Sequence, residues 1–421
     1  MRPGRLIWGM MADVPFDNPL LAAVRDNPYP LYQRLLAQAP VQWNEVLHAW
    51  TLARYADVVG TLTDSRFSAE RPIAETRAAA GPDAAASPAN LDPDSSPRLA
   101  RSMLVSDPPD HTRLRALVQK AFTPRMIEQL RPRIIAIVGE LLDRMSQKSG
   151  IDSEVVDLIG DLAYPLPVVV IAELLGVPAE DRVKFHEWSA VVAASLDPLV
   201  SESVATRVVE ARAALHAYLR EIIALRRREP RADLISALVA VEEQGDVLSE
   251  PELVVMCTLL LIAGHETTVN LIGNGMLALL RHPQELARLR ADPSLITSAV
   301  EELLRFDSPV QLTARIATER LEIGGRAIEA GQWVLPLLGA ANHDPAQFAD
   351  PETLDLSRTP NNHVAFGRGI HFCLGAPLAR LEGQIAIAAL VRRFPNLALA
   401  GDPIRRNQIT LRGLASLPVT T

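Results

Sequence analysis

The stretch that decides the fold is FGRGIHFCLGAPLAR, residues 366 to 380. It holds Cys373, one of two cysteines in a chain of 421 residues, inside a bracket of glycines that opens into an apolar helical pattern. The three glycines at 367, 369 and 375 allow backbone turns that other residues rarely adopt. They also leave room for a planar group to approach the backbone. Cys373 lies just ahead of a predicted helix start, with Pro377 early in that helix. Backbone amides and the positive end of the helix dipole should therefore lower the pKa of the thiol and favour the thiolate.

A thiolate held in this way could be a nucleophile, a metal ligand or an inert core residue. A cysteine hydrolase needs a histidine base and an oxyanion site, and His371, two residues before Cys373, is poorly placed as that base. The second cysteine, Cys257, lies in the apolar run LVVMCTLLLIAG and is predicted to be buried. Two cysteines support neither a disulfide framework nor a paired-cysteine zinc site.

Composition indicates a large helical protein without a general affinity for polyanions. Hydrophobic residues make up 48% of the chain and aromatic residues only 5%, while alanine and leucine are plentiful. The net charge of -8 disfavours nucleic acid and anionic membrane as partners. The basic run Arg226-Arg227-Arg228 is better explained as the solvated end of a helix. Because the N-terminal apolar stretch is too short to span a bilayer and lacks a secretory cleavage pattern, we expect a soluble, cytoplasmic protein. We also expect it to be a monomer.

The pattern along the chain predicts a mainly α protein with small antiparallel β-sheets (α+β), in one domain over 1–421. Residues 110–238 are almost wholly helical in pattern. A helix is expected from Ser249 to about Leu280, with Ser249 and Glu252 as a capping box and Pro251 in its first turn. It is apolar on most sides, which is typical of a central buried helix.

Further elements complete this expectation. Shorter helices are predicted at 283–291 and 295–306, a small antiparallel sheet after Pro309, and a last helix over 376–394. The long stretch 66–106 is rich in Ala, Pro, Asp and Ser. It is either disordered or a mobile segment that covers a ligand pocket.

The opening string matches the F-G-x-G-x-H-x-C-L-G heme signature of the cytochrome P-450 superfamily at every fixed position. Nearly the whole chain resembles a bacterial-type soluble member of that family. The resemblance implies a triangular prism with heme b (iron protoporphyrin IX) between the long central helix and the Cys-bearing proximal helix. It also implies that Cys373 is the thiolate ligand of the iron, which favours O–O cleavage on the opposite face.

A second motif lies in the central helix, where Ala263-Gly264-His265-Glu266-Thr267-Thr268 resembles the family's A-G-x-[D/E]-T-T. A small-residue pair could equally serve only to let another helix pack closely. By resemblance, the Thr267 hydroxyl bonds the Ala263 carbonyl and bends the helix open, and Gly264 leaves space for dioxygen. Glu266 and Thr267 are then the catalytic pair that organises proton delivery through water.

Weaker signals agree with this reading. Glu302 and Arg305 form the ExxR motif followed by a Pro-containing turn and a strand, so they resemble the family's structural pair. Buried heme propionates need paired donors. Four residues resemble the family's propionate partners by position: His111, Arg115, Arg315 and His371.

The resemblance implies a monooxygenase that hydroxylates or epoxidises an apolar small molecule with O2. Its electrons should come from a ferredoxin and a ferredoxin reductase, because the chain has no cysteine cluster for an iron–sulfur centre of its own. A peroxide-driven peroxygenase and a non-catalytic heme-thiolate sensor are the alternatives. The substrate pocket is expected between segment 66–106, residues 185–205 and Ile409 to Leu411. Five further residues are expected to line it: Leu259, Ile262, Ala263, Val310 and Leu312.

Overall fold

The computed structural model describes residues 22–70, 102–151, 155–197, 202–243 and 248–421. Part of the predicted pocket-covering segment, 71–101, and residues 198–201 of the predicted pocket wall lie outside these ranges.

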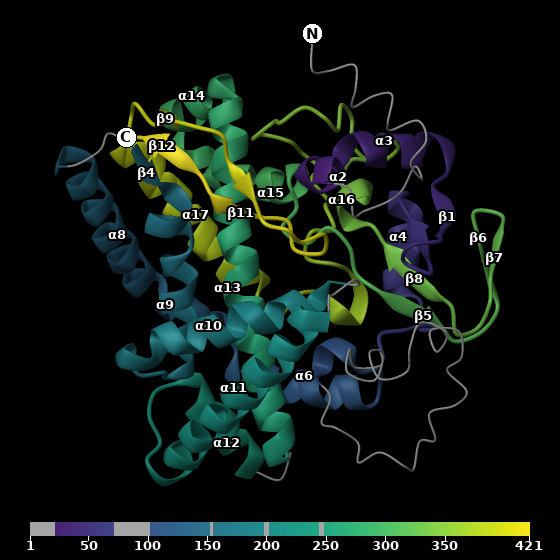
Figure 1. Ribbon diagram of the computed structural model, residues 1–421, viewed down its shortest axis with the longest axis horizontal. Helices are drawn as coiled ribbons and strands as arrows, with labels where there is room; N and C mark the ends of the chain where they lie inside the picture. Colours follow the sequence, from purple (N-terminus) through teal and green to yellow (C-terminus); the bar gives the residue numbers. More distant parts are fainter. Residues whose placement is uncertain (1–21, 71–101, 152–154, 198–201, 244–247) are drawn as a thin grey trace.

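The long helix α13, Glu250–Arg281, runs through the middle of the molecule (Figure 1). It begins where predicted, because Ser249 accepts a hydrogen bond from the Glu252 amide while the Glu252 carboxylate accepts one from the Ser249 amide. Its length and apolar composition would suffice to cross a membrane, with a mean hydropathy of 1.4 over its most apolar window, but 67% of that window is buried inside the fold. The helix is therefore the centre of a protein core, as its pattern predicts.

Other helices cover α13 on several sides. Helix α9 packs along it, and α10, α11, α15 and α17 also contact it. Helices α10, α11 and α12 form one end of the molecule (Figure 1). The helices are α2 Ala22–Asp26, α3 Tyr29–Gln38, α4 Tyr55–Thr63, α6 Asp110–Ala121, α7 Pro124–Gln129, α8 Arg131–Ile151, α9 Pro165–Leu175, α10 Arg182–Ala193, α11 Glu202–Arg228, α12 Leu234–Glu243, α14 Pro283–Ala291, α15 Ile296–Phe306, α16 Leu338–Ala341 and α17 Ala376–Arg393.

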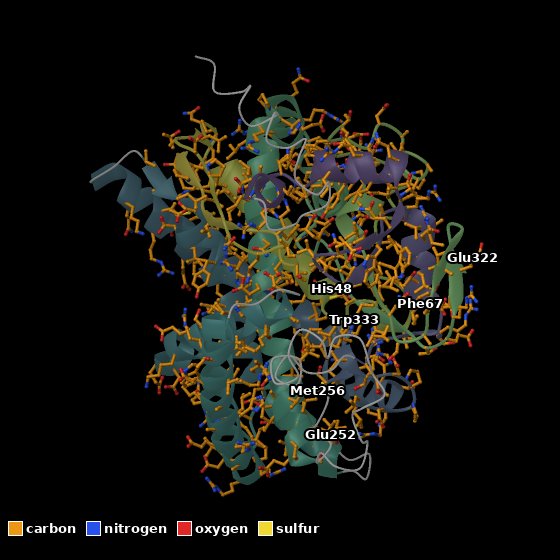
Figure 2. All side chains as sticks on the ribbon, turned by 45° about the vertical axis from the view of Figure 1, so that its right-hand side comes forward. His48, Phe67, Glu252, Met256, Glu322 and Trp333 are labelled. Carbon is orange, nitrogen blue, oxygen red and sulfur yellow. The ribbon has the colours of Figure 1, made fainter. Side chains whose placement is uncertain are left out.

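Short strands form small sheets on both sides of α13, the largest of them on the side of β1 and β8 (Figure 1). The largest has the order β1-β2-β8-β5-β3, in which β2 and β8 are parallel and the other pairs antiparallel. Figure 2 shows Phe67 and Trp333 on this side, while Glu252 and Met256 lie on the first turns of α13. The strands are β1 Val41–Asn44, β2 Ala49–Leu52, β3 Phe67–Ser68, β4 Val155–Asp157, β5 Arg315–Ala317, β6 Leu321–Ile323, β7 Arg326–Ile328, β8 Trp333–Pro336, β9 Ala398–Leu399, β10 Ile404–Arg405, β11 Leu414–Ser416 and β12 Pro418–Thr420.

A buried ion pair fixes α15 to the loop that follows the sheet. Glu302 and Arg305 are both fully buried and joined by two hydrogen bonds of 2.8 Å. Arg358 also donates to Glu302, and Arg305 donates to the carbonyl oxygens of Asn342 and Pro351. Because each of these charged side chains is paired and hydrogen-bonded, the free-energy cost of removing it from water is offset. The same hydrogen bonds fix the path of the loop against α15.

Candidate functional site

The segment before α17 turns sharply around Cys373. Gly367 and Gly369 have positive φ angles of 72° and 69°, as the glycine bracket predicts. At Gly369 a Cβ would also lie 2.5 Å from the carbonyl oxygen of Leu62. Gly375 differs, because its φ of -81° is open to any residue. Only the first two glycines are therefore required by the turn itself.

The environment of the Cys373 sulfur differs in one respect from the sequence prediction. Burial raises the pKa of the thiol, and this outweighs the lowering by hydrogen bonds from the Gly375 and Ala376 amides and by the charges of Arg115 and Arg380. The prediction of a lowered pKa was wrong, because the apolar surroundings of the thiol cannot be seen in the local motif. The amides are nevertheless placed to stabilise a thiolate, and coordination to a metal deprotonates a thiol outright.

Basic and imidazole side chains converge near this sulfur from separate elements. The rings of His111, from α6, and His371 lie with centroids 4.3 Å apart. Arg115 donates to the carbonyl oxygen of Phe372 at 2.8 Å. Arg315 lies close enough that its positive charge lowers the pKa of His371, although burial is the larger cause and the resulting pKa is about 3. The four predicted donors are therefore brought together beside Cys373.

This group of donors fits the anionic edge of a heme. Both ring nitrogens of His111 and the Nε2 atom of His371 are buried without a hydrogen-bond partner among the described residues. Buried polar groups of this kind require acceptors or donors, and two arginines beside them favour an anion. In the described part of the chain no three His, Cys, Asp or Glu side chains converge as a metal site. A metal bound by Cys373 must therefore bring other ligands of its own, as a porphyrin does.

The central helix presents an open stripe in the middle of its buried length. Ala263 is exposed and Thr267 partly exposed, whereas the residues from Thr268 to Leu279 are buried. The Thr267 hydroxyl donates to the Ala263 carbonyl oxygen at 2.9 Å, as predicted from their spacing. At Gly264 the structure supports the alternative of close helix packing, because a Cβ there would lie 2.9 Å from the Ile171 side chain. That glycine lets α9 pack closely against α13.

Glu266 faces away from this stripe. Its side chain is buried and forms an ion pair with Arg406, which follows β10. Its other carboxylate oxygen lies 3.6 Å from Nε2 of His265. The sequence motif places Glu266 next to Thr267 in the chain, but one residue along a helix is a rotation of about 100°, so the two side chains point in different directions.

The predicted substrate residues divide into two groups. Ile262 and Leu411 pack in one apolar cluster with Val192 of α10, and Val310 lies against it. Leu259 and Ala263 are open toward the same central stripe of α13. Leu312 instead packs with α3 and Leu337, away from that cluster, and it lines a cavity together with Ile409, another residue of the predicted pocket.

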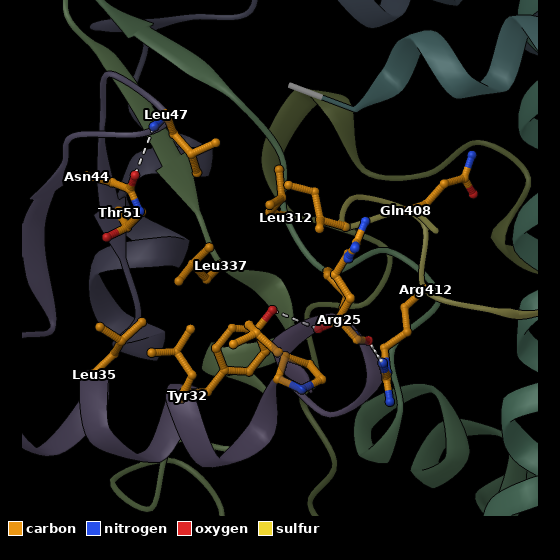
Figure 3. A pocket seen from close by; sticks show the side chains of 15 residues that line it. Arg25, Tyr32, Leu35, Asn44, Leu47, Thr51, Leu312, Leu337, Gln408 and Arg412 are labelled. Carbon is orange, nitrogen blue, oxygen red and sulfur yellow. Dashed lines mark hydrogen bonds between the residues drawn. The ribbon is translucent and has the colours of Figure 1, made fainter. Parts of the chain in front are cut away.

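Leu312 lines a separate small cavity between α3, the first strands and residues 408–412, where the side chain of Arg25 lies between it and Gln408 (Figure 3). The volume of about 60 Å³ is small beside the roughly 300–1,000 Å³ of pockets for drug-sized ligands. The lining residues are Val24, Arg25, Pro28, Leu31, Tyr32, Leu35, Asn44, Leu47, Thr51, Gln311, Leu312, Leu337, Gln408, Ile409 and Arg412.

Three arginines that hold the site were missed by the sequence analysis. Arg406 pairs with Glu266, Arg358 completes the Glu302 network, and Arg380 of α17 binds Glu301 of α15 at 2.6 Å. Arg380 ends the stretch FGRGIHFCLGAPLAR, so its place beside Cys373 could have been noticed. Arg406 offers no such signal, because 139 residues of other structure separate it from its partner.

Comparison with known proteins agrees with this geometry. The family model described as Cytochrome P450 matches residues 79–420. Cytochrome P450 107B1 of Saccharopolyspora erythraea is 47% identical over 381 residues, which cover 89% of each chain. The vitamin D(3) 25-hydroxylase of Pseudonocardia autotrophica is 46% identical over 404 residues, or 94% of each chain.

A solved structure of P450BioI, in complex with an acyl carrier protein ligated to hexadec-9Z-enoic acid, has the same fold. It superposes with a TM-score of 0.85 at 41% identity, over 95% of this chain and 100% of that one. The thiol-bearing turn, the donors beside it and the open stripe on α13 thus occur in a chain that matches these proteins along nearly all its length. The chain belongs to the cytochrome P450 family.

Proposed function

We propose that this cytochrome P450 monooxygenase inserts one atom of O2 into a lipophilic small molecule and reduces the other atom to water. Two observations carry the proposal. The amides of Gly375 and Ala376 donate to the Cys373 sulfur, and Ala263 and Thr267 form an open stripe on the otherwise buried α13. The cofactor is heme b, held by Cys373 at the iron and by His111, Arg115, Arg315 and His371 at the propionates.

The bound heme supplies the oxidising chemistry, and the residues of the chain control access, orientation and protons. The apolar groups near Ile262, Val310 and Leu411 exclude water and favour an apolar substrate. The Thr267 hydroxyl, anchored on the Ala263 carbonyl, is positioned to accept and pass hydrogen bonds in the open stripe. Glu266 is the titratable group nearest to it along the helix and is the source of protons for Thr267.

The electron donor is a ferredoxin that docks on the Cys373 side. Ile370 and Phe372 are 51% and 37% exposed in the turn that holds Cys373. Arg368 and the half-buried Arg115 lie in the same region and give it positive charge. A small apolar centre with a basic rim suits a weak, transient contact with an acidic partner.

The protein acts in the cytoplasm as a monomer, and its substrate is apolar but otherwise unspecified. Two of the similar proteins differ in what they bind or act on. One is a vitamin D(3) 25-hydroxylase, and the solved structure of P450BioI is a complex with an acyl carrier protein. An optical titration of the heme-loaded ferric protein against lipophilic compounds tests the substrate class. Binding in the site displaces the distal water and shifts the absorption, whereas no response from any apolar compound contradicts the proposal.

Turnover assays then separate the reaction types. With a bound substrate, ferredoxin, ferredoxin reductase and NAD(P)H, the protein should form hydroxylated or epoxidised product. Equal rates with hydrogen peroxide alone would indicate a peroxygenase instead. Substrate binding without turnover by either route would indicate a sensor.

A further inference from the structure

The small cavity beside α3 contains a charged side chain whose polar end has no protein partner. Arg25, in α2, is half-buried and extends its guanidinium between Leu312 and Gln408 (Figure 3). Within the described ranges of the chain, no side chain or carbonyl forms a hydrogen bond or an ion pair with that guanidinium. A cation that is partly removed from water and left unpaired favours an anionic ligand.

The rest of the cavity wall offers little else to a polar ligand. The Tyr32 hydroxyl donates to Oε1 of Gln311 at 2.9 Å, and Nε2 of Gln311 donates to the carbonyl oxygen of Ser308 at 2.8 Å. Gln408 directs its amide away from the cavity (Figure 3). The apolar side chains of the wall are Val24, Leu31, Leu35, Leu47, Leu312 and Leu337. The cavity is therefore an apolar recess with the Arg25 cation at its edge.

This recess adjoins the predicted substrate residues. Val310 pairs with Leu411 in a short antiparallel contact between two chain segments, and both lie in or against the apolar cluster next to α13. Leu312 and Ile409, two residues away on the same two segments, line the recess. Two residues of extended chain span about 7 Å. An elongated ligand over α13 could therefore place its far end in the recess.

A buried ion-pair network holds the backbone of Arg25 in place. Nη1 of Arg412 donates to the carbonyl oxygen of Arg25 at 2.7 Å, and Nη2 donates to that of Asp26 at 2.9 Å. Nε of Arg412 donates to Oδ1 of Asp307 at 2.7 Å, and Arg405 pairs with the same carboxylate. Arg412 and Arg405 are thus committed to Asp307. Arg25 is held by its backbone, so its guanidinium is positioned in advance and stays available to a ligand.

Asp197, just after α10, is an acid near enough to sense the charge of Arg25. Burial raises the pKa of its carboxyl, and hydrogen bonds from Thr410 and Ile409 together with the charge of Arg25 act against this effect. The Thr410 amide donates to Oδ1 of Asp197 at 2.8 Å. These bonds hold the carboxylate on the turn at Ile409 and Thr410, where it forms no ion pair with Arg25. An incoming anion does not have to displace it.

We propose that the recess is a subsite for the carboxylate of an elongated lipophilic acid, and that Arg25 binds this carboxylate. The apolar body of the acid reaches past Leu312 and Ile409 to the cluster at Val310 and Leu411. This inference rests on the proposed monooxygenase function and names the substrate class of the same site. The volume of about 60 Å³ is too small for a whole substrate but sufficient for its end. Oxidation is then directed to carbon atoms far from the carboxyl group.

The test uses ligands that differ only in the head group. Dodecanoic acid and hexadecanoic acid, each with its methyl ester and its primary alcohol, are titrated into the heme-loaded ferric protein. The absorption shift gives the dissociation constants, and isothermal titration calorimetry measures them without the heme signal. The wild type should bind each acid about tenfold more tightly than the ester or the alcohol, because the acid alone forms a charge-assisted hydrogen bond.

Variants of the cation should remove this preference selectively. Arg25→Gln should weaken binding of the acids about tenfold and leave the esters unchanged, whereas Arg25→Lys should retain most of the affinity for the acids. Leu312→Phe narrows the recess with Arg25 intact and should also weaken the acids. The matched control is Arg320→Gln, which removes the same charge from a side chain that is 73% exposed. It should leave all the dissociation constants unchanged.

Three results would each overturn the proposal: equal affinity of the wild type for acid and ester, no binding of either acid, or wild-type affinity for the acids in folded Arg25→Gln. Failure of the proposed function is distinguishable, because it appears as absence of turnover of a bound acid, while the dissociation constants do not depend on turnover. A protein that oxidises the esters without any preference for the acids would keep its proposed function and lose this subsite.

Discussion

The imidazole rings of His111 and His371 lie 4.3 Å apart and are inclined at 53°, although 259 residues of chain separate the two positions. One comes from the first turn of α6 and the other from the turn before Cys373. Their unpaired nitrogens, together with Arg115 and Arg315, create a site that is electrostatically incomplete without an anion. The heme would therefore contribute to the stability of the fold as well as to its chemistry.

Removal of one cation from this site should weaken heme retention. Arg315→Gln would remove the charge-assisted hydrogen bond that we propose between Arg315 and a propionate, which should cost about 2 kcal/mol, or roughly a 30-fold increase in the dissociation constant. Transfer of heme to an excess of a heme-accepting apoprotein measures this change. The exposed Arg320→Gln is the control, and equal retention in both variants would contradict the assignment of Arg315.

The Thr267 hydroxyl should affect coupling and not heme binding. In Thr267→Ala we expect normal heme content but a several-fold lower yield of product per electron, with the difference released as hydrogen peroxide. Thr267→Ser keeps the hydroxyl and should recover most of the yield. The control is Thr258→Ala, because Thr258 makes the same bond to a carbonyl oxygen four residues earlier, at 2.9 Å, on the same helix. Undiminished coupling in Thr267→Ala would argue against its role.

The Glu302 network should be required for stability. Glu302→Gln leaves Arg305 and Arg358 without a full counter-charge in a buried place, which should cost about 3–5 kcal/mol of unfolding free energy. Urea denaturation of the heme-loaded protein measures this cost. The exposed pair Glu128 and Arg131 has the same spacing, so Glu128→Gln should change the midpoint far less. Similar losses in both variants would contradict a special role for the buried network.

Acid should loosen the contact between α15 and α17. Burial alone would raise the pKa of Glu301, but hydrogen bonds from Arg380 and His363 outweigh it and hold the pKa near 2, against 4.5 for the ordinary side chain. A carboxyl whose pKa is lower in the folded state adds stability that is complete above pH 4.5 and is lost as the pH falls toward 2. This carboxyl should contribute up to about 3 kcal/mol.

The test is the pH dependence of urea unfolding. Glu301→Gln should flatten the curve between pH 4.5 and 2, while the exposed Glu319→Gln should leave its slope unchanged. A curve for Glu301→Gln that is parallel to that of the wild type would show that the ion pair of Glu301 with Arg380 contributes nothing to the free energy of unfolding.

Much of the fold is readable from local sequence, for identifiable reasons. The capping box at Ser249 and Glu252 fixes the start of α13, and the pattern around Pro283 fixes its end. The turn before Cys373 needs positive φ at Gly367 and Gly369, which only glycine accepts readily. These features depend on neighbours within a few residues, so the sequence contains the information.

Features that depend on tertiary packing were not predictable in this way. The raised pKa of the Cys373 thiol reflects burial by distant elements, and the contact of Gly264 with Ile171 depends on how α9 lies on α13. The pairing of Glu266 with Arg406 joins the central helix to a hairpin near the end of the chain. No periodicity or motif encodes such a contact.

The proposed function requires a bond between the Cys373 sulfur and the heme iron. Its most direct test is the absorption spectrum of the purified, reduced protein under carbon monoxide. We predict the long-wavelength Soret band of a thiolate-ligated heme, and its loss in Cys373→His with heme still bound. A wild-type protein that shows the shorter-wavelength band of a histidine-ligated heme, or that binds no heme, would contradict it.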